Sequence, residues 1–258
     1  MLVAGHTIPA AAVTLLTAAV GVAEDLEIGS IAILMVAVFS GQLVVGWTND
    51  LIDRERDRQV GRTDKPLASG DLSPTTAVVA VGVAGVVCVV ASLACGLAAA
   101  AVHLVLGIGS ALAYNAGLKS TYLSWLPYFV AFGSLPVVVT LTADPTYLPP
   151  VWMIAVSGLL GVGAHLLNVM PDLDDDAATG ITGLPHRLGA RRIPGVAAGL
   201  LIGATAIAVV ANSQVMWLWI GLGVVVVIAL TTMRRSGRAP FYGAIAIAGV
   251  DVTMLLLT

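Results

Sequence analysis

Two runs of polar residues share one spacing in a chain that is otherwise strongly apolar. In each run an Asn is followed by an Asp four positions later and by another Asp after four more. The runs are Asn49, Asp53 and Asp57, and Asn168, Asp172 and Asp176. Because four residues advance a helix by only about 40° around its axis, each run predicts a stripe of oxygen ligands on one helix face.

Paired stripes of carboxylates indicate a divalent-cation site. Carboxylates crowded together near lipid repel one another and are costly to desolvate unless a cation joins them. Oxygen ligands favour Mg2+, and the natural anionic partner of several Mg2+ ions is a diphosphate. The alternative for the first run is a solvated helix laced with salt bridges. The second run argues against it, because Asp172 and Asp174 to Asp176 lie together with no basic residue before Arg187.

Composition places the chain among integral membrane proteins. It has 258 residues, of which 58% are hydrophobic and only 10% are charged, and its mean hydropathy is +0.97. The 12 basic and 15 acidic residues nearly balance, so nucleic acid is not expected as a partner. We expect a single domain over residues 1–258, with the lipid bilayer as its surroundings.

Nine apolar segments are long enough to cross a bilayer, and they must position the two runs. They are residues 7–23, 28–48, 76–95, 97–115, 121–142, 150–170, 193–211, 214–232 and 239–257. No Lys or Arg precedes Arg54, so the first segment is interpreted as a span and not as a cleaved signal peptide.

All 12 basic residues fall in alternate connections between these segments. By the positive-inside rule, those connections and the N-terminus are cytoplasmic, and the C-terminus is outside. Both polar runs then lie on the cytoplasmic face. The sequence predicts an all-α protein of the cell membrane, with nine transmembrane helices around a central cleft that faces the cytoplasm.

The polar runs resemble the motifs of the UbiA-type intramembrane prenyltransferases. The first family motif, Asn-Asp-x-x-Asp-x-x-x-Asp, is matched by Asn49, Asp50, Asp53 and Asp57. The second is matched by Asp172, Asp176, Gly180 and Arg187-Leu188-Gly189, and a Tyr-x-x-x-Leu-Lys element is matched by Tyr114, Leu118 and Lys119. The resemblance covers the whole chain and includes the count of nine helices.

The resemblance implies Mg2+-dependent transfer of an isoprenyl group from an isoprenyl diphosphate to an aromatic or lipophilic acceptor in the membrane. It implies metal ligands at Asn49, Asp50, Asp53, Asp57, Asp172 and Asp176, and catalytic roles for Asp53, Asp172, Tyr114 and Lys119. The departing diphosphate gains negative charge, so basic groups aimed at it stabilise the transition state. Arg62, Lys65, Lys119 and Arg187 are the candidate cations. Tyr114, His165 and Asn168 are expected to contact substrate, with His165 one turn deeper on the metal-binding face.

Some residues depart from the family pattern. Family members that prenylate an aromatic acid need a cation for its carboxylate, and the first two segments contain no Lys or Arg. Acceptors of the 4-hydroxybenzoate type are therefore less expected. The stretch Gly183-Leu184-Pro185-His186 also differs from the family's usual Thr-Leu before Arg-Leu-Gly.

Three other functions were compared with prenyl transfer. A membrane terpene cyclase would use the same site, with the substrate's own double bond capturing the cation. A CDP-alcohol phosphotransferase is disfavoured because its Asp-Gly-x-x-Ala-Arg opening is missing from the sequence. An ion-coupled transporter would place its carboxylates near the bilayer midplane, whereas these lie at the ends of spans.

Overall fold

The computed structural model describes residues 7–235 and 237–257, which form helices joined by turns and contain no β-strand. The long helices are α1 (Thr7–Ala23), α2 (Ile28–Gln59), α4 (Pro74–Ala94), α7 (Leu126–Ala143), α8 (Val151–Val169), α11 (Ile193–Ala211), α12 (Leu218–Thr232) and α13 (Ala239–Leu256). A further long segment joins α5 (Leu97–Ala101), the π-helical η1 (Val102–Gly109) and α6 (Ser110–Ala116). The short elements are α3 (Pro66–Ser69), η2 (Leu118–Ser120), η3 (Tyr122–Trp125), η4 (Met170–Asp172), α9 (Leu173–Ala178) and α10 (Leu184–Leu188).

Seven helical segments of the described chain are long and apolar enough to cross a membrane. Two more apolar helices are shorter, namely α1 with 17 residues and α12 with 15. Large aliphatic side chains cover the outer faces, and Val83, Val86 and Val90 of α4 are each more than 60% exposed. An apolar outer surface of this kind suits lipid and not water. The prediction of an all-helical integral membrane protein is confirmed.

The nine apolar helical segments lie close to the predicted spans, except that α2 continues to Gln59, beyond the predicted end at residue 48, and that α12 begins late. The eighth span was predicted to begin at residue 214, but α12 begins at Leu218. Residues 212–217 form turns instead, with the Asn212 amide donating a hydrogen bond to the carbonyl of Ala208 at 2.9 Å. A side chain that bonds to the preceding turn caps the end of α11, and apolar composition alone could not place the next start.

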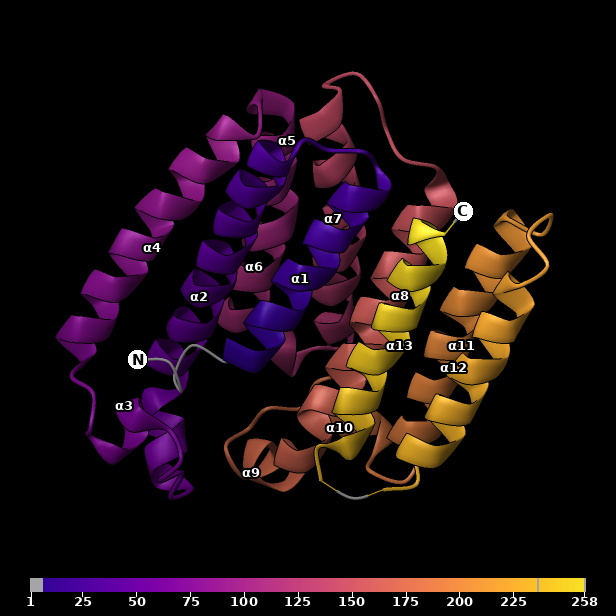
Figure 1. Cartoon of the computed structure of the whole chain (residues 1–258). Helices are drawn as coiled ribbons and strands as arrows, with labels where there is room; N and C mark the ends of the chain where they lie inside the picture. Colours follow the sequence, from indigo (N-terminus) through magenta and orange to yellow (C-terminus); the bar gives the residue numbers. More distant parts are fainter. Residues whose placement is uncertain (1–6, 236, 258) are drawn as a thin grey trace.

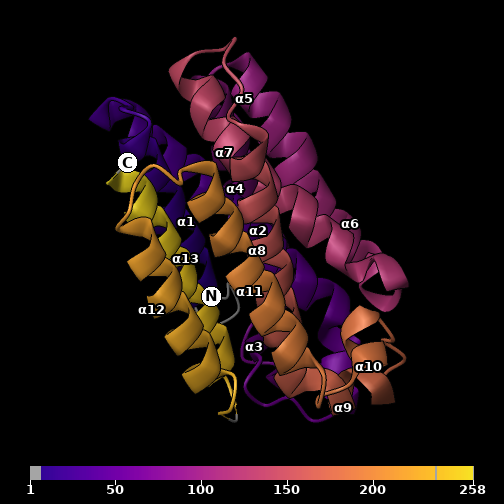
Figure 2. The same cartoon turned by 90° about the vertical axis from the view of Figure 1, so that its right-hand side faces the viewer.

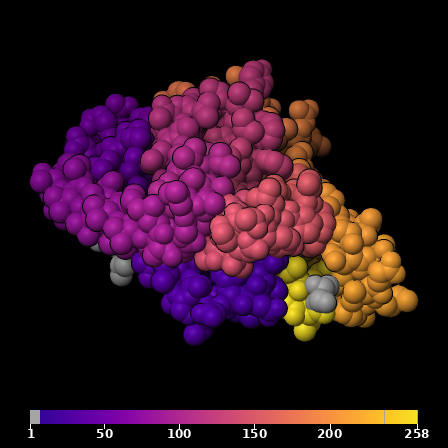
Figure 3. All heavy atoms as spheres, turned by 90° about the horizontal axis from the view of Figure 1, so that it is seen from above, coloured from indigo at the N-terminus to yellow at the C-terminus, as the bar shows by residue number. Residues whose placement is uncertain are grey.

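The long helices run side by side in two groups (Figures 1 and 2). One apolar core joins α1, α2, α5 and α7, and a second joins α8, α11, α12 and α13. Seen from above, α1 in indigo lies beside α13 in yellow, so the first and last long helices are neighbours (Figure 3). The short helices α3, α9 and α10 gather at the end opposite to this view (Figures 1 and 2).

The first polar run lies on one uninterrupted helix, as predicted. Helix α2 has 32 residues and is about 48 Å long at 1.5 Å per residue, whereas the hydrocarbon core of a bilayer measures about 30 Å. Its last turns therefore extend beyond the lipid core. Asn49, Asp53 and Asp57 lie in these turns on a rigid rod that continues through the membrane.

The second polar run does not form one straight helical stripe, which corrects the prediction. Helix α8 ends at Val169, a 3-10 turn covers Met170–Asp172, and α9 resumes at Leu173. Pro171 lies in this turn, where its missing N–H and its ring disfavour continued α-helix. Asn168, Asp172 and Asp176 thus come from three consecutive elements.

Close packing of α7 on α8 depends on small residues. A Cβ atom placed on Gly161 would lie 2.6 Å from Cγ of Phe132 on α7. We expect Gly161→Ala to destabilise the protein by about 1–3 kcal/mol, because the root of the Phe132 side chain cannot rotate away. Gly199→Ala on α11 is the control, since open space surrounds Gly199. Thermal unfolding in detergent measures both, and equal stabilities would contradict the expectation.

Candidate functional site

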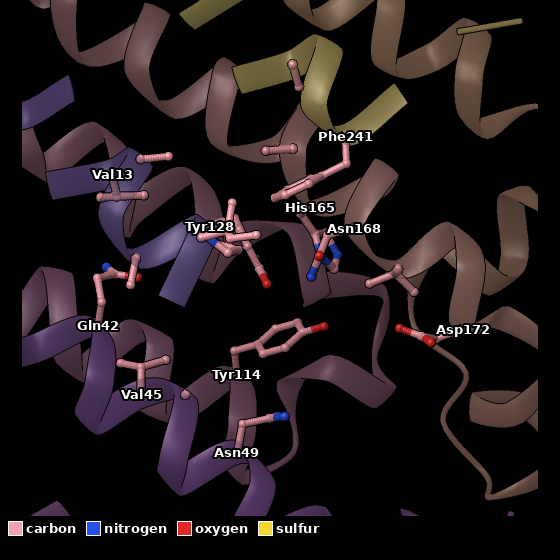
Figure 4. Close-up of a pocket in the computed structure, with 18 of the residues that line it drawn as sticks. Val13, Gln42, Val45, Asn49, Tyr114, Tyr128, His165, Asn168, Asp172 and Phe241 are labelled. Atoms are coloured by element: carbon pink, nitrogen blue, oxygen red, sulfur yellow. The ribbon is translucent and has the colours of Figure 1, made fainter. Parts of the chain in front are cut away.

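A cavity of about 660 Å3 lies between the two groups of helices. Its walls come mainly from α1, α2, α6, α7, α8 and α13. At the end near α3, α9 and α10 it is lined by both polar runs, and toward the other end it is lined by side chains such as Val20, Val139 and Val252. Figure 4 shows Tyr114, Tyr128 and Asn168 projecting into it. The cavity thus joins a charged compartment to an apolar one.

The carboxylates of the first run are held by two lysines. Lys65 Nζ lies 3.2 Å from an oxygen of Asp50 and 3.0 Å from an oxygen of Asp57, so it bridges the two side chains. Burial alone would lower the pKa of Lys65, but the two carboxylates together raise it above its ordinary value. Lys65 is therefore a charged ammonium group at the cavity wall.

Lys119 is the more buried of the two lysines, with only 5% of its surface exposed. Its Nζ donates hydrogen bonds of 2.6 Å to both oxygens of Asp53. It lies just after Gly117, whose φ of 153° requires glycine and turns the chain out of α6. Burial lowers the pKa of Lys119, and the neighbouring carboxylates, chiefly Asp53, offset only part of that effect. The pair joins the first run to the segment between α6 and α7.

Arg62 follows α2 in the chain and bonds to the second polar run. One Nη of Arg62 donates a 2.8 Å hydrogen bond to Asp172, and its remaining N–H groups bond to Asp64 at 2.9 and 3.0 Å. On the far side of the second run, His186 Nε2 lies 3.5 Å from an oxygen of Asp176. The acids around Asp172, which have no Lys or Arg near them in sequence, thus gain Arg62 as a cationic partner from elsewhere in the fold.

The side chains around this end fit a bound divalent cation. No group of three or more His, Cys, Asp or Glu residues is already clustered as a metal site in the described part of the chain. Nevertheless, carboxylates outnumber Lys and Arg side chains in the cavity lining. The acids are Asp50, Asp53, Asp57, Asp64, Asp172, Asp175 and Asp176, and the bases are Arg56, Arg62, Lys65, Lys119 and Arg238. The ammonium groups of Lys65 and Lys119 occupy positions that suit a cation, and the excess of oxygen ligands suits Mg2+.

Aromatic rings form the boundary between the charged and apolar compartments. The rings of Tyr128 and His165 stack with centroids 4.3 Å apart, and Tyr114 meets both rings edge-on at 5.1 and 5.4 Å. His165 is fully buried, and its Nε2 lies 3.4 Å from Ser124 Oγ, which accepts the N–H of Leu184 at 3.0 Å. The rings of Tyr114 and Tyr128 therefore have fixed orientations at the cavity wall.

The structure brings all but one of the predicted site residues to this cavity. Those that line it are Asn49, Asp50, Asp53, Asp57, Arg62, Lys65, Tyr114, Lys119, His165, Asn168, Asp172 and Asp176. Arg187 is the exception, which corrects its predicted place beside the substrate. Its guanidinium lies 3.6 Å from the ring centroid of Tyr122, and its Nε bonds to the carbonyl of Thr182. Because α10 turns Arg187 outward, His186 faces the cavity instead.

Sequence reasoning missed several further cavity residues with polar or aromatic side chains, and three of them are Tyr128, Phe241 and Arg238. Tyr128 could have been predicted as a site residue, because it is aromatic, lies one helical turn after Ser124 and follows Pro127. Phe241 and Arg238 could not, since nothing in the sequence indicates that the start of the last span lies beside the first. Only the packing of α13 against α1 and α8 brings them to the site.

Comparison with known proteins gives the fold a precedent. A family model described as the UbiA prenyltransferase family matches residues 8–240. The apo structure of a UbiA homolog from Aeropyrum pernix K1 has a TM-score of 0.77 at 18% identity, covering 95% of this chain and 96% of that one. A UbiA homolog from Archaeoglobus fulgidus bound to GPP and Mg2+ has a TM-score of 0.70 at 12% identity, covering 100% and 99%. A digeranylgeranylglyceryl phosphate synthase structure reaches 0.64 at 16% identity, covering 99% and 94%. No curated protein sequence matches the chain.

Proposed function

Since the chain belongs to the UbiA prenyltransferase family, we propose that it transfers an isoprenyl group from an allylic diphosphate to an aromatic or lipophilic acceptor in the membrane, with Mg2+ as its cofactor. The observation that carries this proposal is the meeting of both polar runs at the charged end of one cavity whose other end is apolar. A diphosphate with a hydrocarbon chain has the same division of polarity. The binding of GPP and Mg2+ by a protein of the same fold supports the assignment.

We propose that the charged compartment holds the diphosphate. Asn49, Asp50, Asp53, Asp57, Asp172 and Asp176 would hold Mg2+, which when bound neutralises the charge that develops on the departing diphosphate. Lys65 and Lys119 supply N–H donors for its oxygens, and Arg62 and Asn168 add donors at the second run. Arg187 is left out of this set because it lies outside the cavity lining.

The aromatic boundary suits the next stage of the reaction. When the allylic C–O bond breaks, its electron pair stays with the diphosphate and the carbon chain becomes a cation. The rings of Tyr114 and Tyr128 lie where the two compartments meet, and aromatic rings attract cations through their negative faces. Buried behind Tyr128, His165 keeps that ring in place. The apolar walls exclude water, which would otherwise capture the cation before the acceptor does.

We also propose that all nine apolar segments cross the cell membrane as one domain, with the charged end of the cavity in the cytoplasm. Helices α1 and α12 are shorter than the other seven, but α1 packs between α2 and α13, and α12 packs between α11 and α13. The exclusive location of Lys and Arg in alternate connections supports the orientation. The N-terminus would then be cytoplasmic and the C-terminus outside.

Removal of the metal tests the proposal most directly. We expect purified protein in proteoliposomes to release diphosphate from an allylic diphosphate with Mg2+, and to lose this activity in EDTA. Restoring Mg2+ should recover it, because the carboxylates alone cannot neutralise the leaving group. Diphosphate release that persists in EDTA would contradict the proposal. A cyclic hydrocarbon or alcohol formed without acceptor would redirect the assignment to a membrane terpene cyclase.

A further inference from the structure

Arg238 differs from the other basic side chains that line the cavity. Each of the other four lies within ion-pair distance of a carboxylate, namely Arg56, Arg62, Lys65 and Lys119. Arg238 makes no ion pair with any described residue, and it reaches the cavity from the start of α13 and not from either polar run. Its guanidinium is therefore available to a ligand, on the wall formed by the last helix.

Arg238 begins a stripe of cavity-facing residues along α13. Phe241, Ile245, Ala248 and Val252 follow it at helical spacing, and all of them line the cavity. The stripe is about 21 Å long at 1.5 Å per residue, against about 30 Å for the hydrocarbon core of a bilayer. Figure 4 shows Phe241 projecting toward His165 and Asn168. One charge followed by a long apolar track matches an amphiphile with an anionic head.

The cavity has exposed lining residues in the first turns of both α1 and α13. Ile8 of α1 and Tyr242 of α13 both line the cavity, yet they are 60% and 46% exposed. The two helices are neighbours, and each contributes one of these exposed residues to the cavity lining. An aliphatic and an aromatic side chain beside an arginine suit the interface between lipid and water.

We propose that this stripe is the acceptor site, and that Arg238 binds a carboxylate or phosphate on an amphiphilic acceptor. The inference rests on the proposed prenyl transfer and adds the chemical class of the acceptor. The first two spans contain no cation for such a group, and the start of α13 supplies one. The head of the acceptor then lies at the same end of the cavity as the diphosphate.

This placement puts the acceptor's nucleophile near its head group. As the allylic C–O bond breaks, its electrons stay on the diphosphate. A hydroxyl oxygen or aromatic carbon of the acceptor donates an electron pair to the allylic carbon, and the proton it loses passes to the diphosphate. Phe241 lies one helical turn after Arg238 on α13 and projects toward His165. It can therefore contact the apolar body of the acceptor.

The test compares Arg238→Gln with Arg235→Gln, a control in the same connection whose side chain does not line the cavity. GPP is the donor, and the acceptors are two matched pairs of amphiphiles. One pair is a hydroxybenzoic acid with an alkyl chain on its ring and the corresponding alkylphenol, and the other is a monoalkylglycerol phosphate and its uncharged monoalkylglycerol. KM is measured for donor and acceptor separately. Binding of each amphiphile is measured in EDTA without GPP.

We expect the anionic member of at least one pair to be the better acceptor, and the two pairs distinguish a carboxylate from a phosphate. Arg238→Gln should raise the KM for that acceptor roughly tenfold to a hundredfold, because a charge-assisted hydrogen bond is lost. Arg238→Lys should retain part of the preference. The KM for GPP and the use of uncharged acceptors should not change, and Arg235→Gln should behave as the unmodified protein.

Two results would overturn the inference while leaving prenyl transfer intact. One is a higher KM for GPP in Arg238→Gln, which would assign the arginine to the donor. The other is equal use of charged and uncharged acceptors by the unmodified protein. If the unmodified protein releases no diphosphate with Mg2+, the proposed function fails instead. In that case, loss of amphiphile binding in Arg238→Gln, measured in EDTA, would still support an anion site.

Discussion

Asp53→Asn and Asp172→Asn are each expected to reduce diphosphate release by roughly a hundredfold to a thousandfold. The two substitutions keep the size of the side chain and remove one negative oxygen from each polar run. Both carboxylates line the charged end of the cavity, from opposite sides of it. If they hold a common cation and diphosphate, losing either one removes a ligand whose effect grows as charge develops in the transition state.

The cluster around Asp172 provides a matched control. Asp174 belongs to the same acidic stretch, but its side chain does not line the cavity. Asp174→Asn should therefore retain the activity of the unmodified protein, although it makes the same change in net charge. Initial rates of diphosphate release at saturating Mg2+ compare the variants, with size-exclusion chromatography to confirm folding. Full activity in Asp172→Asn, or a loss in Asp174→Asn as large as in Asp172→Asn, would refute the assignment of the metal site.

The second large effect is expected from Lys119→Met, which should impair both stability and activity. Lys119 is 5% exposed and bonds to both oxygens of Asp53. Its loss leaves a buried carboxylate with Arg56 as its remaining charged partner. Breaking a buried ion pair costs several kcal/mol, and we expect about 3 kcal/mol here. Activity should fall as well, because a donor for the diphosphate disappears.

A double variant separates the two effects of Lys119. Asp53→Asn combined with Lys119→Met removes both charges, so most of the lost stability should return, whereas activity should not. Thermal unfolding in detergent gives the stability, and diphosphate release gives the activity. A single Lys119→Met variant as stable as the unmodified protein would show that the pair contributes nothing to folding. Recovery of activity in the double variant would rule out a direct role of either side chain.

Sequence patterns predicted the helices better than the connections between them. The apolar segments of roughly twenty residues gave α1, α4, α8 and α11 nearly to their ends, because lipid requires long apolar helices. The spacing of Asn49, Asp53 and Asp57 was read correctly as one helical stripe. The same spacing after α8 was misread, since Pro171 allows a 3-10 turn that periodicity does not reveal.

Long-range partners could not be predicted in the same way. Arg62 follows α2, but its partner Asp172 lies 110 positions later in the chain. No local rule links them, because the contact depends on how the end of α2 packs relative to the turn after α8. Arg187 shows the opposite error, since a motif position predicted a role beside the substrate. The direction of a short helix, α10, decided that His186 and not Arg187 reaches the cavity.

Lys65 and Lys119 also bear on the order in which substrates bind. In the described structure they act as internal counter-ions for Asp50, Asp57 and Asp53, so these three carboxylates already have cationic partners. A divalent cation that binds without diphosphate must displace the ammonium groups of Lys65 and Lys119 from their carboxylate partners. When a divalent cation binds together with diphosphate, the cation pairs with the carboxylates and the diphosphate becomes the new anionic partner of the ammonium groups. We therefore expect the protein to bind Mg2+ more tightly in the presence of an isoprenyl diphosphate than in its absence.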